Sequence, residues 1–300
     1  MYDINELFDT FSKKCECRID EPMSKHTTFR IGGKADIVLY PNEERTISQI
    51  IKFCNTHNIP LKIFGKGSNI LVSDDGIRGA VIILDSRFSE IRLVDETSIV
   101  CQAGASMAAI GEFTCEKSLT GFEFGAGIPG TIGGALYMNA GAYDGEMSNI
   151  VVSARYLDAD GNVHTISKGD MKLGYRKSVF SDTNCCITEV EIKLEKGNRE
   201  DIRLKMNDLM HRRASKQPLN FPSAGSTFKR PTGYFAGALI EQSGLKGYSV
   251  GGACVSEKHA GFVVNKGNAT ANDVMKLIEH IKQTVKNDSG VELECEIKFV

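Results

Sequence analysis

The stretch FGAGIPGTIGG, residues 124–134, places five glycines within eleven residues. Gly125, Gly127 and Gly130 match the G-x-G-x-x-G pattern of a dinucleotide-binding turn, which in a Rossmann fold follows a buried strand and leads into a helix. The preceding residues, CEKSLTGFEF, are too polar for such a strand, and the two glycines at 133 and 134 disfavour a regular helix. The sequence therefore argues against a Rossmann fold and predicts a loop whose backbone N–H groups bind an anion such as pyrophosphate.

A second glycine-containing loop, GKGSNI at residues 65–70, lies between two predicted strands in the stretch LKIFGKGSNILVSDDG. Its backbone N–H groups, together with Ser68 and Asn69, could bind the same anion. For either loop taken alone, a tight turn without a ligand is the favoured interpretation. Two such loops in one chain are more informative than either alone, and together they favour a ligand that contains phosphate.

The overall composition is that of an ordinary globular protein. The chain has 300 residues, of which 41% are hydrophobic and 25% charged, enough for one large domain or two ordinary ones. A net charge of −2 without a basic stripe argues against nucleic-acid binding. No apolar run is long enough to span a membrane, and the N-terminus lacks the features of a signal peptide. The nine cysteines contain no C-x-x-C pair, so we expect a cytoplasmic protein whose reduced thiols serve as small apolar side chains.

Short strands alternate with helices along the chain. Apolar residues at helical spacing predict a helix at 4–11 and a second helix that buries Ile47, Ile50, Ile51 and Cys54. The other predicted elements are strands at 35–41, 80–85 and 291–299, a helix at 106–119, a β-hairpin around Asp160–Gly161, a charged helix that ends before Pro218, a helix at 235–243, a hairpin within 247–265 and a helix from Thr270.

Two helix caps and one strand carry more specific expectations. Asn42 is the predicted N-cap of the helix that follows it, and Thr270 with Asp273 forms a capping box. In the terminal stretch VELECEIKF, residues 291–299, apolar residues alternate with three glutamates. Because strand side chains alternate between faces, all three carboxylates are expected on one face of this strand.

The pattern predicts an α+β or mixed α/β architecture in two parts. Its character changes near Gly197–Asn198, where strand-rich sequence gives way to a charged helix. We therefore expect a first domain at 1–197, itself divided into two lobes near residue 86, and a second domain at 198–300.

Several longer stretches together resemble the UDP-N-acetylenolpyruvoylglucosamine reductase family, which comprises flavoenzymes of bacterial peptidoglycan precursor synthesis. They occur in the family's order and extend over residues 27–299. The matching stretches are TTFRIGGKADIVLYP, GKGSNILVSD, GIPGTIGGALYMNAGAYDGEM, GYRKSVF, AGSTFKRP, ALIEQSGLKG and the terminal LECEIKF.

The resemblance implies a two-lobed FAD-binding domain of the vanillyl-alcohol-oxidase type, followed by a smaller α+β substrate-binding domain. The pyrophosphate of FAD would then lie against both glycine loops. Related oxidases often attach flavin through a histidine beside a glycine pair, but RIGGKA has Lys34 there, so non-covalent FAD is expected. The cofactor-binding residues implied in this way are Gly65, Lys66, Gly67, Ser68, Asn69, Gly130, Thr131, Gly133, Gly134, Asn139, Gly141 and Ala142.

The resemblance also implies the reaction. A hydride would pass from NADPH through FAD to C3 of UDP-N-acetylglucosamine enolpyruvate, and an acid would protonate C2 to give UDP-N-acetylmuramate. Hydride addition at C3 builds negative charge at C2 and its carboxylate, so the site needs a preorganised cation and a proton source. NADPH and the nucleotide sugar would be the partners of a protein that we expect to be monomeric, with no metal ion.

Three residues match the family's catalytic positions. Ser226 in AGSTF would donate the proton, Arg176 in GYRKSVF would hold the developing enolate and carboxylate, and Glu296 in LECEIKF would assist enolate polarisation. Without the resemblance, Ser226 would be a turn serine, Arg176 a solvated cation and Glu296 an exposed strand carboxylate. A shift of two residues in the match would exchange Glu296 for Glu294.

Four residues match or replace substrate contacts of the family. Tyr175 and Lys216 match residues that contact the nucleotide-sugar diphosphate, although Lys216 could also be an ordinary surface lysine. Arg230 and His259 stand where the better-described branch of the family carries amide side chains. The chain also leaves no room for that branch's inserted loop with a lid tyrosine, so it resembles the shorter branch, in which Tyr234 could partly replace the lid.

Two other functions stay open from the sequence. One is another FAD-dependent oxidoreductase of this fold that oxidises an alcohol or sugar with oxygen. The other is a non-catalytic protein that binds flavin or a nucleotide sugar. The combination of Ser226, Arg176 and Glu296 in matching contexts favours the reductase over both.

Overall fold

The computed structural model describes residues 3–300, which divide into two compact units. Each unit combines segments that are far apart in the sequence. The first comprises the described residues up to Ile19, Asp36–Lys66 and Gly79–Arg212, and the second comprises Asp20–Ala35, Gly67–Arg78 and Arg213–Val300. The sequence-based boundary at 197/198 and the division near 86 stay predictions. None of the helices formed by residues 3–300 is both long enough and apolar enough to span a membrane.

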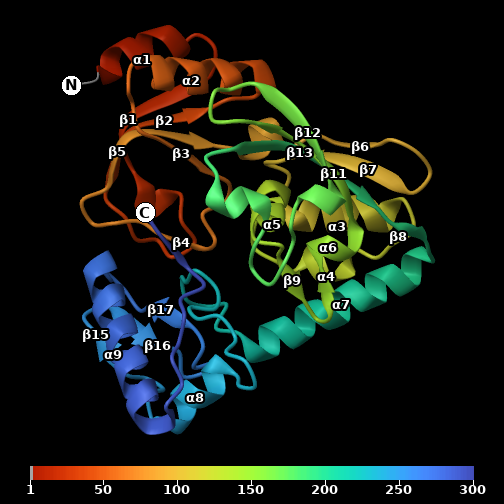
Figure 1. The fold of residues 1–300 in the computed structure, drawn as a ribbon. Helices are drawn as coiled ribbons and strands as arrows, with labels where there is room; N and C mark the ends of the chain where they lie inside the picture. The colour runs from red at the N-terminus through yellow and green to blue at the C-terminus, as the bar shows by residue number, and fades with distance from the viewer. Residues whose placement is uncertain (1–2) are drawn as a thin grey trace. The chain divides into compact units, whose positions relative to one another are not determined.

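A four-stranded sheet and two helices form the N-terminal part of the first unit (Figure 1). These elements are α1 (Ile4–Phe11), α2 (Glu44–Thr56), β1 (Glu16–Pro22), β2 (Lys34–Tyr40), β3 (Leu61–Phe64) and β5 (Ile77–Ile83). The strand order is β1-β2-β5-β3, with β3 and β5 parallel. Ile47, Ile50, Ile51 and Cys54 are all buried, which confirms the predicted apolar face of α2.

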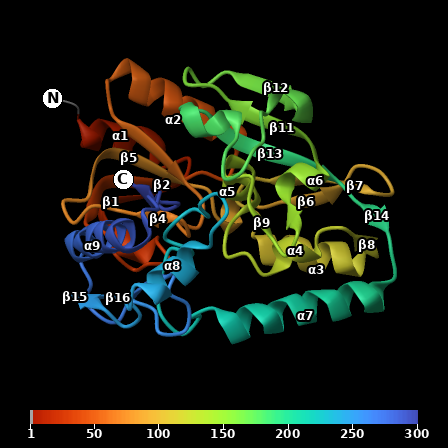
Figure 2. The same cartoon turned by 60° about the horizontal axis from the view of Figure 1, so that its bottom comes forward.

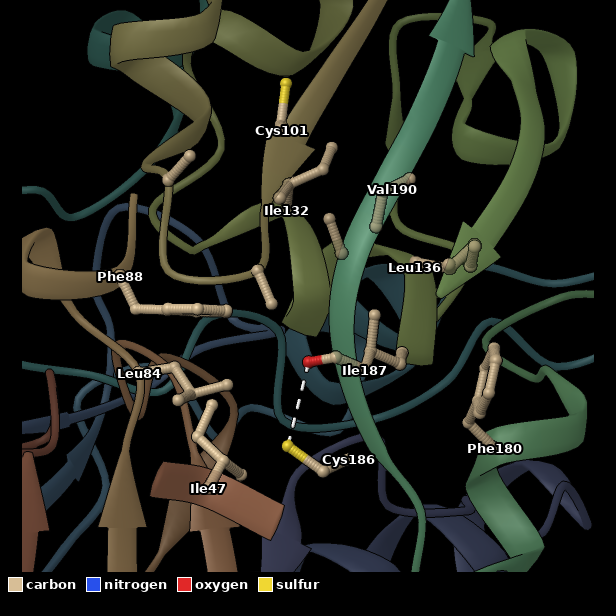
Figure 3. Packing of buried hydrophobic residues seen from close by; sticks show 14 of the residues in the cluster. Ile47, Leu84, Phe88, Cys101, Ile132, Leu136, Phe180, Cys186, Ile187 and Val190 are labelled. Atoms are coloured by element: carbon tan, nitrogen blue, oxygen red, sulfur yellow. Dashed lines mark hydrogen bonds between the residues drawn. The ribbon is translucent and has the colours of Figure 1, made fainter. Parts of the chain in front are cut away.

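A five-stranded antiparallel sheet forms a second layer of the first unit (Figure 2). Its strands, and two helices beside it, are β6 (Ile91–Leu93), β7 (Ser98–Gln102), β11 (Val151–Leu157), β12 (Val163–Ser167), β13 (Cys186–Lys193), α3 (Met107–Glu116) and α5 (Ile132–Tyr137). The order is β12-β11-β13-β7-β6, and β11 and β12 form the predicted hairpin. Figure 3 shows Ile132 and Leu136 of α5 packed beside Val190 of β13, so the helix that follows the glycine stretch is anchored in the core.

Short elements and one long helix complete the first unit. The long helix α7 (Arg199–Lys216) confirms the predicted charged helix, and the unit division falls after its residue Arg212. The short elements of this unit are β8 (Leu119–Thr120) paired with β14 (Glu195–Lys196), β9 (Gly141–Ala142) paired with β10 (Gly145–Glu146), α4 (Glu123–Ala126), α6 (Met147–Ile150), η2 (Ser86–Phe88), η3 (Lys168–Asp170) and η4 (Val179–Asp182).

The second unit packs two helices with a small antiparallel sheet. Its elements are η1 (Met23–Lys25), α8 (Ala236–Gln242), α9 (Ala271–Ser289), β4 (Ile70–Leu71), β15 (Ser249–Val250), β16 (Ala253–Val255), β17 (Val263–Asn265) and β18 (Lys298–Phe299). The predicted capping box is confirmed, since Thr270 accepts from the Asp273 N–H and Asp273 accepts from the Thr270 N–H. Asp74 adds a second cap, accepting from the N–H groups of Ala271 and Asn272 at 2.7 and 3.0 Å.

Two predicted helix boundaries are wrong. The N-cap of α2 is Glu43 rather than Asn42, because the Glu43 carbonyl accepts the first helical hydrogen bond, from the Ile47 N–H. Helix α3 begins as predicted with Ser106 as its N-cap but ends at Glu116. Ser118 then has a φ of 56°, which cannot continue a right-handed helix, and the next two residues form β8.

The terminal stretch is a strand only in part. It pairs with β4 in parallel at Lys298 and Phe299, and before that it forms an isolated bridge between Cys295 and Phe228. Leu293 and Ile297 are buried as the alternation predicts, but Phe299 is 49% exposed. The period-two prediction therefore holds for the middle of the stretch and fails at its end, where Phe299 is exposed.

Two short helices overlap the ends of the glycine stretch at residues 124–134. Helix α4, rather than a strand, precedes Gly127, which agrees with the prediction that this is no Rossmann turn. The prediction that the glycines would prevent a helix is wrong, because α5 begins at Ile132. Gly133 explains the difference, since a Cβ added there would lie 2.7 Å from the Ala103 Cβ. Only glycine permits this close approach, and the resulting packing offsets the weak helix propensity of glycine.

Candidate functional site

The loop at residues 65–69 presents backbone donors that the protein does not use. Within residues 3–300, the N–H groups of Gly65, Lys66, Gly67 and Ser68 have no hydrogen-bond acceptor. Gly67 has a φ of 60°, and a Cβ there would lie 2.1 Å from the His26 carbonyl oxygen, so the loop conformation requires glycine. A run of unpaired N–H groups in a loop with a left-handed residue is the arrangement that binds anions.

Gly65 of the first glycine-containing loop contacts the second such loop inside the first unit. A Cβ added to Gly65 would lie 2.3 Å from the Thr131 Oγ1, so the first loop's backbone touches the side chain that begins α5. Across the described chain, the N–H groups of Gly130 and Thr131 also lack an acceptor. Gly134, in the first turn of α5, is exposed, and a Cβ there would contact only Thr131, at 3.7 Å. The sequence-based expectation that both loops serve one ligand stays a prediction.

These features fit the pyrophosphate of FAD. The unpaired N–H groups of Gly65, Lys66, Gly130 and Thr131 all belong to the first unit and can satisfy phosphate oxygens. Gly65 and Gly133 have no space for a side chain, while Gly134 leaves its side of the loop open, so the backbone permits close approach. The donor set is therefore suited to a diphosphate, with Lys66 exposed at the same loop as an additional cation.

Asn139 has both ends of its side chain engaged within the protein. It is fully buried, donates from Nδ2 to the Gly174 carbonyl at 3.0 Å, and accepts at Oδ1 from the Ser148 N–H at 2.8 Å. This residue was expected to contact the cofactor, and that contact stays a prediction. What the structure adds is a positioning role, because Asn139 fixes the residue that precedes Tyr175 and Arg176.

Gly141 and Ala142, the last two predicted cofactor residues, form β9 of a tight hairpin with β10. Tyr143 and Asp144 connect the strands, and both have positive φ, 52° and 66°. Two consecutive positive φ values are those of a type I′ turn, which normally carries asparagine or glycine. The hairpin thus holds two ordinary residues in an uncommon backbone conformation, and Tyr143 is exposed at its tip.

Tyr175 and Arg176 form the tip of a two-residue turn. Gly174 and Lys177 exchange backbone hydrogen bonds of 2.9 and 3.1 Å, and between them Arg176 has a φ of 55°. The left-handed conformation costs a non-glycine residue roughly 1–2 kcal/mol. The Arg176 guanidinium lies 5.0 Å from the centre of the Tyr175 ring. A strained, half-buried arginine stacked on an exposed tyrosine is typical of a binding site rather than of an ordinary surface turn.

Ser226 and Glu296 lie on neighbouring backbone segments of the second unit. The Glu296 N–H donates to the Thr227 carbonyl, and the Lys229 N–H donates to the Glu294 carbonyl, at 2.9 and 2.8 Å. The hydroxyl of Ser226 has no hydrogen-bond partner within the described part of the chain. Two of the three predicted catalytic residues are therefore brought together in one unit. Arg176 belongs to the other unit and is described with it.

The structure also distinguishes Glu296 from Glu294. The side chain of Glu294 is 73% exposed and forms an ion pair with Lys229, whereas Glu296 is half-buried. Asn69 donates from Nδ2 to the Glu296 carbonyl at 3.1 Å and accepts at its own carbonyl from the Lys298 N–H at 2.9 Å. The glycine-containing loop thus fixes the backbone of Glu296, a link that sequence analysis missed because the two residues are 227 positions apart.

The predicted substrate residues occupy different settings. Lys216 is exposed in the last turn of α7, and the Arg230 guanidinium stacks on Phe235 at 4.0 Å from the ring centre. His259 is half-buried and accepts at Nδ1 from the Gly261 N–H at 3.1 Å, so its neutral form carries the proton on Nε2. Burial lowers the pKa of His259, and the charge of Lys246 acts in the same direction. A neutral His259 can therefore donate from Nε2 to a phosphate oxygen.

Two family models match this chain. A model described as the C-terminal domain of UDP-N-acetylenolpyruvoylglucosamine reductase matches residues 217–300, and one described as an FAD-binding domain matches residues 35–167. The expected order of an FAD-binding domain followed by a smaller α+β domain is confirmed by these matches.

Relatives similar to this chain extend over nearly its whole length. The UDP-N-acetylenolpyruvoylglucosamine reductase of Clostridioides difficile (strain 630) is 49% identical over 98% of this chain and 96% of its own. That of Clostridium perfringens (strain SM101 / Type A) is 47% identical with the same coverage. Among solved structures, the reductase of Thermus caldophilus superimposes with a TM-score of 0.80 at 30% identity, covering 95% of this chain and 98% of that one.

Proposed function

This chain belongs to the UDP-N-acetylenolpyruvoylglucosamine reductase family, and we propose that it reduces UDP-N-acetylglucosamine enolpyruvate to UDP-N-acetylmuramate with NADPH as electron donor. The single observation that carries the proposal is a pair of backbone hydrogen bonds, from Glu296 to Thr227 and from Lys229 to Glu294. This ladder holds Ser226 and Glu296 on adjacent segments. When bound, FAD would accept a hydride from NADPH and deliver it to C3 of the enolpyruvyl ether. The chain's own residues must then bind the diphosphate, stabilise charge at C2 and supply a proton.

Ser226 is the proposed proton donor to C2. Its hydroxyl makes no hydrogen bond to the residues that the structure describes, so it is available to a ligand. Gly225 before it has a φ of 75°, and Thr227 after it is held by three hydrogen bonds. The backbone around Ser226 is therefore fixed while its side chain is not. General acid catalysis of this kind contributes about 10²–10⁴-fold to a rate.

Arg176 and Glu296 are the proposed stabilisers of the enolate and its carboxylate. A guanidinium is always charged, and its planar donors match a carboxylate in two bonds. Glu296 would polarise the enolate from the second unit, held there by the bonds that Thr227 and Asn69 make to its backbone. The left-handed backbone at Arg176 supports this role, because strain of this kind concentrates at functional sites.

The diphosphate of the substrate is the proposed ligand of Tyr175, Lys216, Arg230 and His259. Arg230 is preorganised by its stacking on Phe235, which lowers the entropy lost on binding. His259 would donate from Nε2 as a neutral group. Tyr234, 49% exposed, is the candidate replacement for the absent lid tyrosine. We further propose that the enzyme acts in the cytoplasm as a monomer.

Anaerobic half-reactions test the function. The purified protein should contain non-covalent FAD whose yellow absorbance bleaches on addition of NADPH and returns on addition of UDP-N-acetylglucosamine enolpyruvate. A flavin that bleaches but is re-oxidised only by oxygen would favour the alternative oxidoreductase. A flavin that NADPH does not bleach would favour the non-catalytic binding protein, and a colourless protein that rejects FAD would refute both the function and the cofactor.

Ser226→Ala tests the residue that would distinguish the two halves of the reaction. Flavin reduction by NADPH should be nearly unchanged, while re-oxidation by the substrate should slow by about 10²-fold or more. Ser223→Ala, in the same segment, is the matched control, because its carbonyl rather than its hydroxyl takes part in the hydrogen bond from Thr28. Equal losses in both half-reactions of Ser226→Ala would mean that the residue supports the fold or the flavin instead.

A further inference from the structure

Two cysteines that the proposed function does not use lie in contact at the start of β1. The Sγ atoms of Cys15 and Cys17 are 3.9 Å apart, and both residues are half-buried in the first unit, while Glu16 between them is exposed. The Cys17 thiol also points to the Cys15 carbonyl, at 3.5 Å. Cys15 directly precedes β1 and Cys17 lies within it, at the two-residue spacing that places side chains of extended backbone on the same face.

This pair differs from the other cysteines. Cys54, Cys101, Cys115, Cys186 and Cys254 are buried, which makes them poorly accessible to reagents in water. Burial raises the pKa of Cys54 and Cys101 to about 12, so their reactive thiolate forms are suppressed. The adjacent pair Cys185 and Cys186 offers a comparison, because it has one half-buried and one buried thiol but no recorded sulfur–sulfur contact among the described residues.

The surroundings of Cys15 favour its ionised form. The hydrogen bond from the Cys17 thiol lowers the pKa of Cys15, and the backbone of Tyr40 and the charge of Lys14 act in the same direction against the effect of burial. The same thiol–thiol bond, with burial, raises the pKa of Cys17. Cys15 is therefore the thiol of the pair that ionises more readily, and Cys17 is the thiol that stays protonated, which is the division of roles in a reactive dithiol.

The geometry permits a disulfide with a small movement. A disulfide needs its sulfurs about 2.05 Å apart, and the two Sγ atoms are already close to van der Waals contact. The ring closed between positions 15 and 17 would be small, so it would constrain the unfolded chain little and contribute little stability. Such a bond is more easily reduced than a structural disulfide, and reversible oxidation follows.

We propose that Cys15 and Cys17 form a reversible dithiol site that hydrogen peroxide oxidises to a disulfide before the other thiols of the chain react. The Cys15 thiolate attacks one peroxide oxygen, the O–O bond breaks, and a Cys15 sulfenic acid and hydroxide result. The Cys17 sulfur then attacks the Cys15 sulfur, so that the S–S bond forms, the S–O bond breaks and the leaving hydroxide takes the Cys17 proton as water. A small thiol reverses the oxidation. This site is independent of the proposed reductase activity.

Peptide mass analysis tests the proposal directly, because Lys14 and Arg18 are trypsin sites that release both thiols in the tetrapeptide CECR. The intact flavoprotein would be treated with limiting hydrogen peroxide, unfolded, alkylated and digested. On oxidation, CECR should lose two hydrogens and can then no longer be alkylated. This oxidation should be about tenfold faster than that of the peptide SVFSDTNCCITEVEIK, residues 178–193, which contains Cys185 and Cys186. Dithiothreitol should restore double alkylation.

Three outcomes would overturn the proposal. The first is a CECR peptide that is still doubly alkylated when the 178–193 peptide has been oxidised. The second is a CECR peptide that gains oxygen instead of losing hydrogen. The third is oxidation of CECR that is equally fast in native and in urea-unfolded protein. Cys17→Ser should leave Cys15 trapped as a sulfenic acid that dimedone labels, and Cys15→Ser should leave Cys17 no more reactive than Cys185. Cys185→Ser, the matched control, should oxidise at Cys15–Cys17 at the original rate.

Discussion

The turn that carries Arg176 and the ladder that carries Ser226 and Glu296 hold their side chains in opposite ways. The turn has one strained residue at its tip and depends on a buried amide, Asn139, behind it. The ladder uses ordinary backbone conformations at both residues and several main-chain hydrogen bonds. A single side chain can therefore disturb the first arrangement, whereas the second depends mainly on backbone.

The difference matters for how each region responds to substitution. The left-handed conformation of Arg176 persists only while the surrounding structure enforces it. A change that loosens the turn should therefore also move the charge of the guanidinium. At Ser226 and Glu296, a side chain can change while the main-chain bonds persist. Substitutions in the turn should therefore affect both stability and chemistry. Substitutions of Ser226 or Glu296 by residues other than glycine or proline should affect mainly chemistry.

The largest expected effect is that of Arg176→Ala on the second half-reaction. Loss of a preorganised charge at a developing anion slows the reaction by about 10²–10³-fold. Re-oxidation of the reduced flavoprotein by UDP-N-acetylglucosamine enolpyruvate, followed by stopped-flow absorbance, measures it. Lys177→Ala removes the neighbouring exposed cation, which pairs with Asp182 at 3.1 Å, and should be nearly neutral. If the two variants behave alike, Arg176 is an ordinary surface cation.

Glu296→Gln should slow the same step by about 10²-fold while flavin content and stability stay unchanged. Glutamine keeps the size of the side chain and leaves the backbone bonds to Thr227 and Asn69 intact. Glu294→Gln is the control, since that carboxylate is exposed and pairs with Lys229. A larger loss in Glu294→Gln would show that the family match is shifted by two residues.

Asn139→Ala should lower the free energy of unfolding by about 2–4 kcal/mol, because a fully buried amide is removed and two part-buried backbone groups lose their partners. Those groups are the Gly174 carbonyl and the Ser148 N–H. Asn149→Ala removes an exposed side chain whose Oδ1 accepts from the Glu146 N–H, and it should lower the free energy of unfolding by about 1 kcal/mol. Urea unfolding at equal flavin saturation measures both, and similar losses would contradict the proposed dependence of the turn on Asn139.

Replacing Arg176 and Ser226 each by glycine and by alanine tests the difference in backbone strain between the turn and the ladder. Arg176→Gly should be more stable than Arg176→Ala by about 1 kcal/mol, because glycine adopts a φ of 55° without the penalty of a Cβ. At Ser226, where the backbone is not left-handed, the order should reverse, with glycine less stable by about 0.5–1 kcal/mol. Both pairs would be measured by urea unfolding, and the same order at both positions would remove the distinction.

The smallest expected effect is a pH dependence from His259. Burial lowers its pKa, so between that value and the ordinary value of 6.5 the unfolded chain binds more protons than the folded protein. Stability therefore falls as the pH decreases through this range. His259→Gln should remove that dependence in urea unfolding followed from about pH 7.5 to about pH 5.5, whereas the exposed His211→Gln should not. An unchanged slope in His259→Gln would show that this imidazole is not responsible.

Local patterns predicted the helices and their burial well. The apolar face of α2 and the capping box of α9 follow from residues within one or two turns of each other. Boundaries were less predictable, as Glu43 and Ser118 show, because they depend on backbone conformations that side-chain type only biases. The helix after Gly130 was missed because its stability comes from packing against Ala103, which no local pattern contains.

Site residues could be named from family resemblance but not arranged from it. The sequence contains no sign that Asn69 would bond to the backbone of Glu296, or that Asn139 would support Gly174. Asparagine is usually a surface residue, so its burial could not be anticipated from type alone.

By itself, the amino-acid sequence determined which faces are apolar, where glycine leaves the backbone open and to which family the chain belongs. Periodicity is a property of neighbouring residues, and the order of motifs can be read along the chain without knowing how it folds. The tertiary structure alone decided that Gly65 touches Thr131, that the Ser226 segment pairs with the Glu296 segment, and that Cys15 and Cys17 meet sulfur to sulfur. The first two contacts join residues far apart in the chain, and the third depends on side-chain orientation. Neither partner choice nor orientation is encoded in a local pattern, since both result from how the whole chain packs.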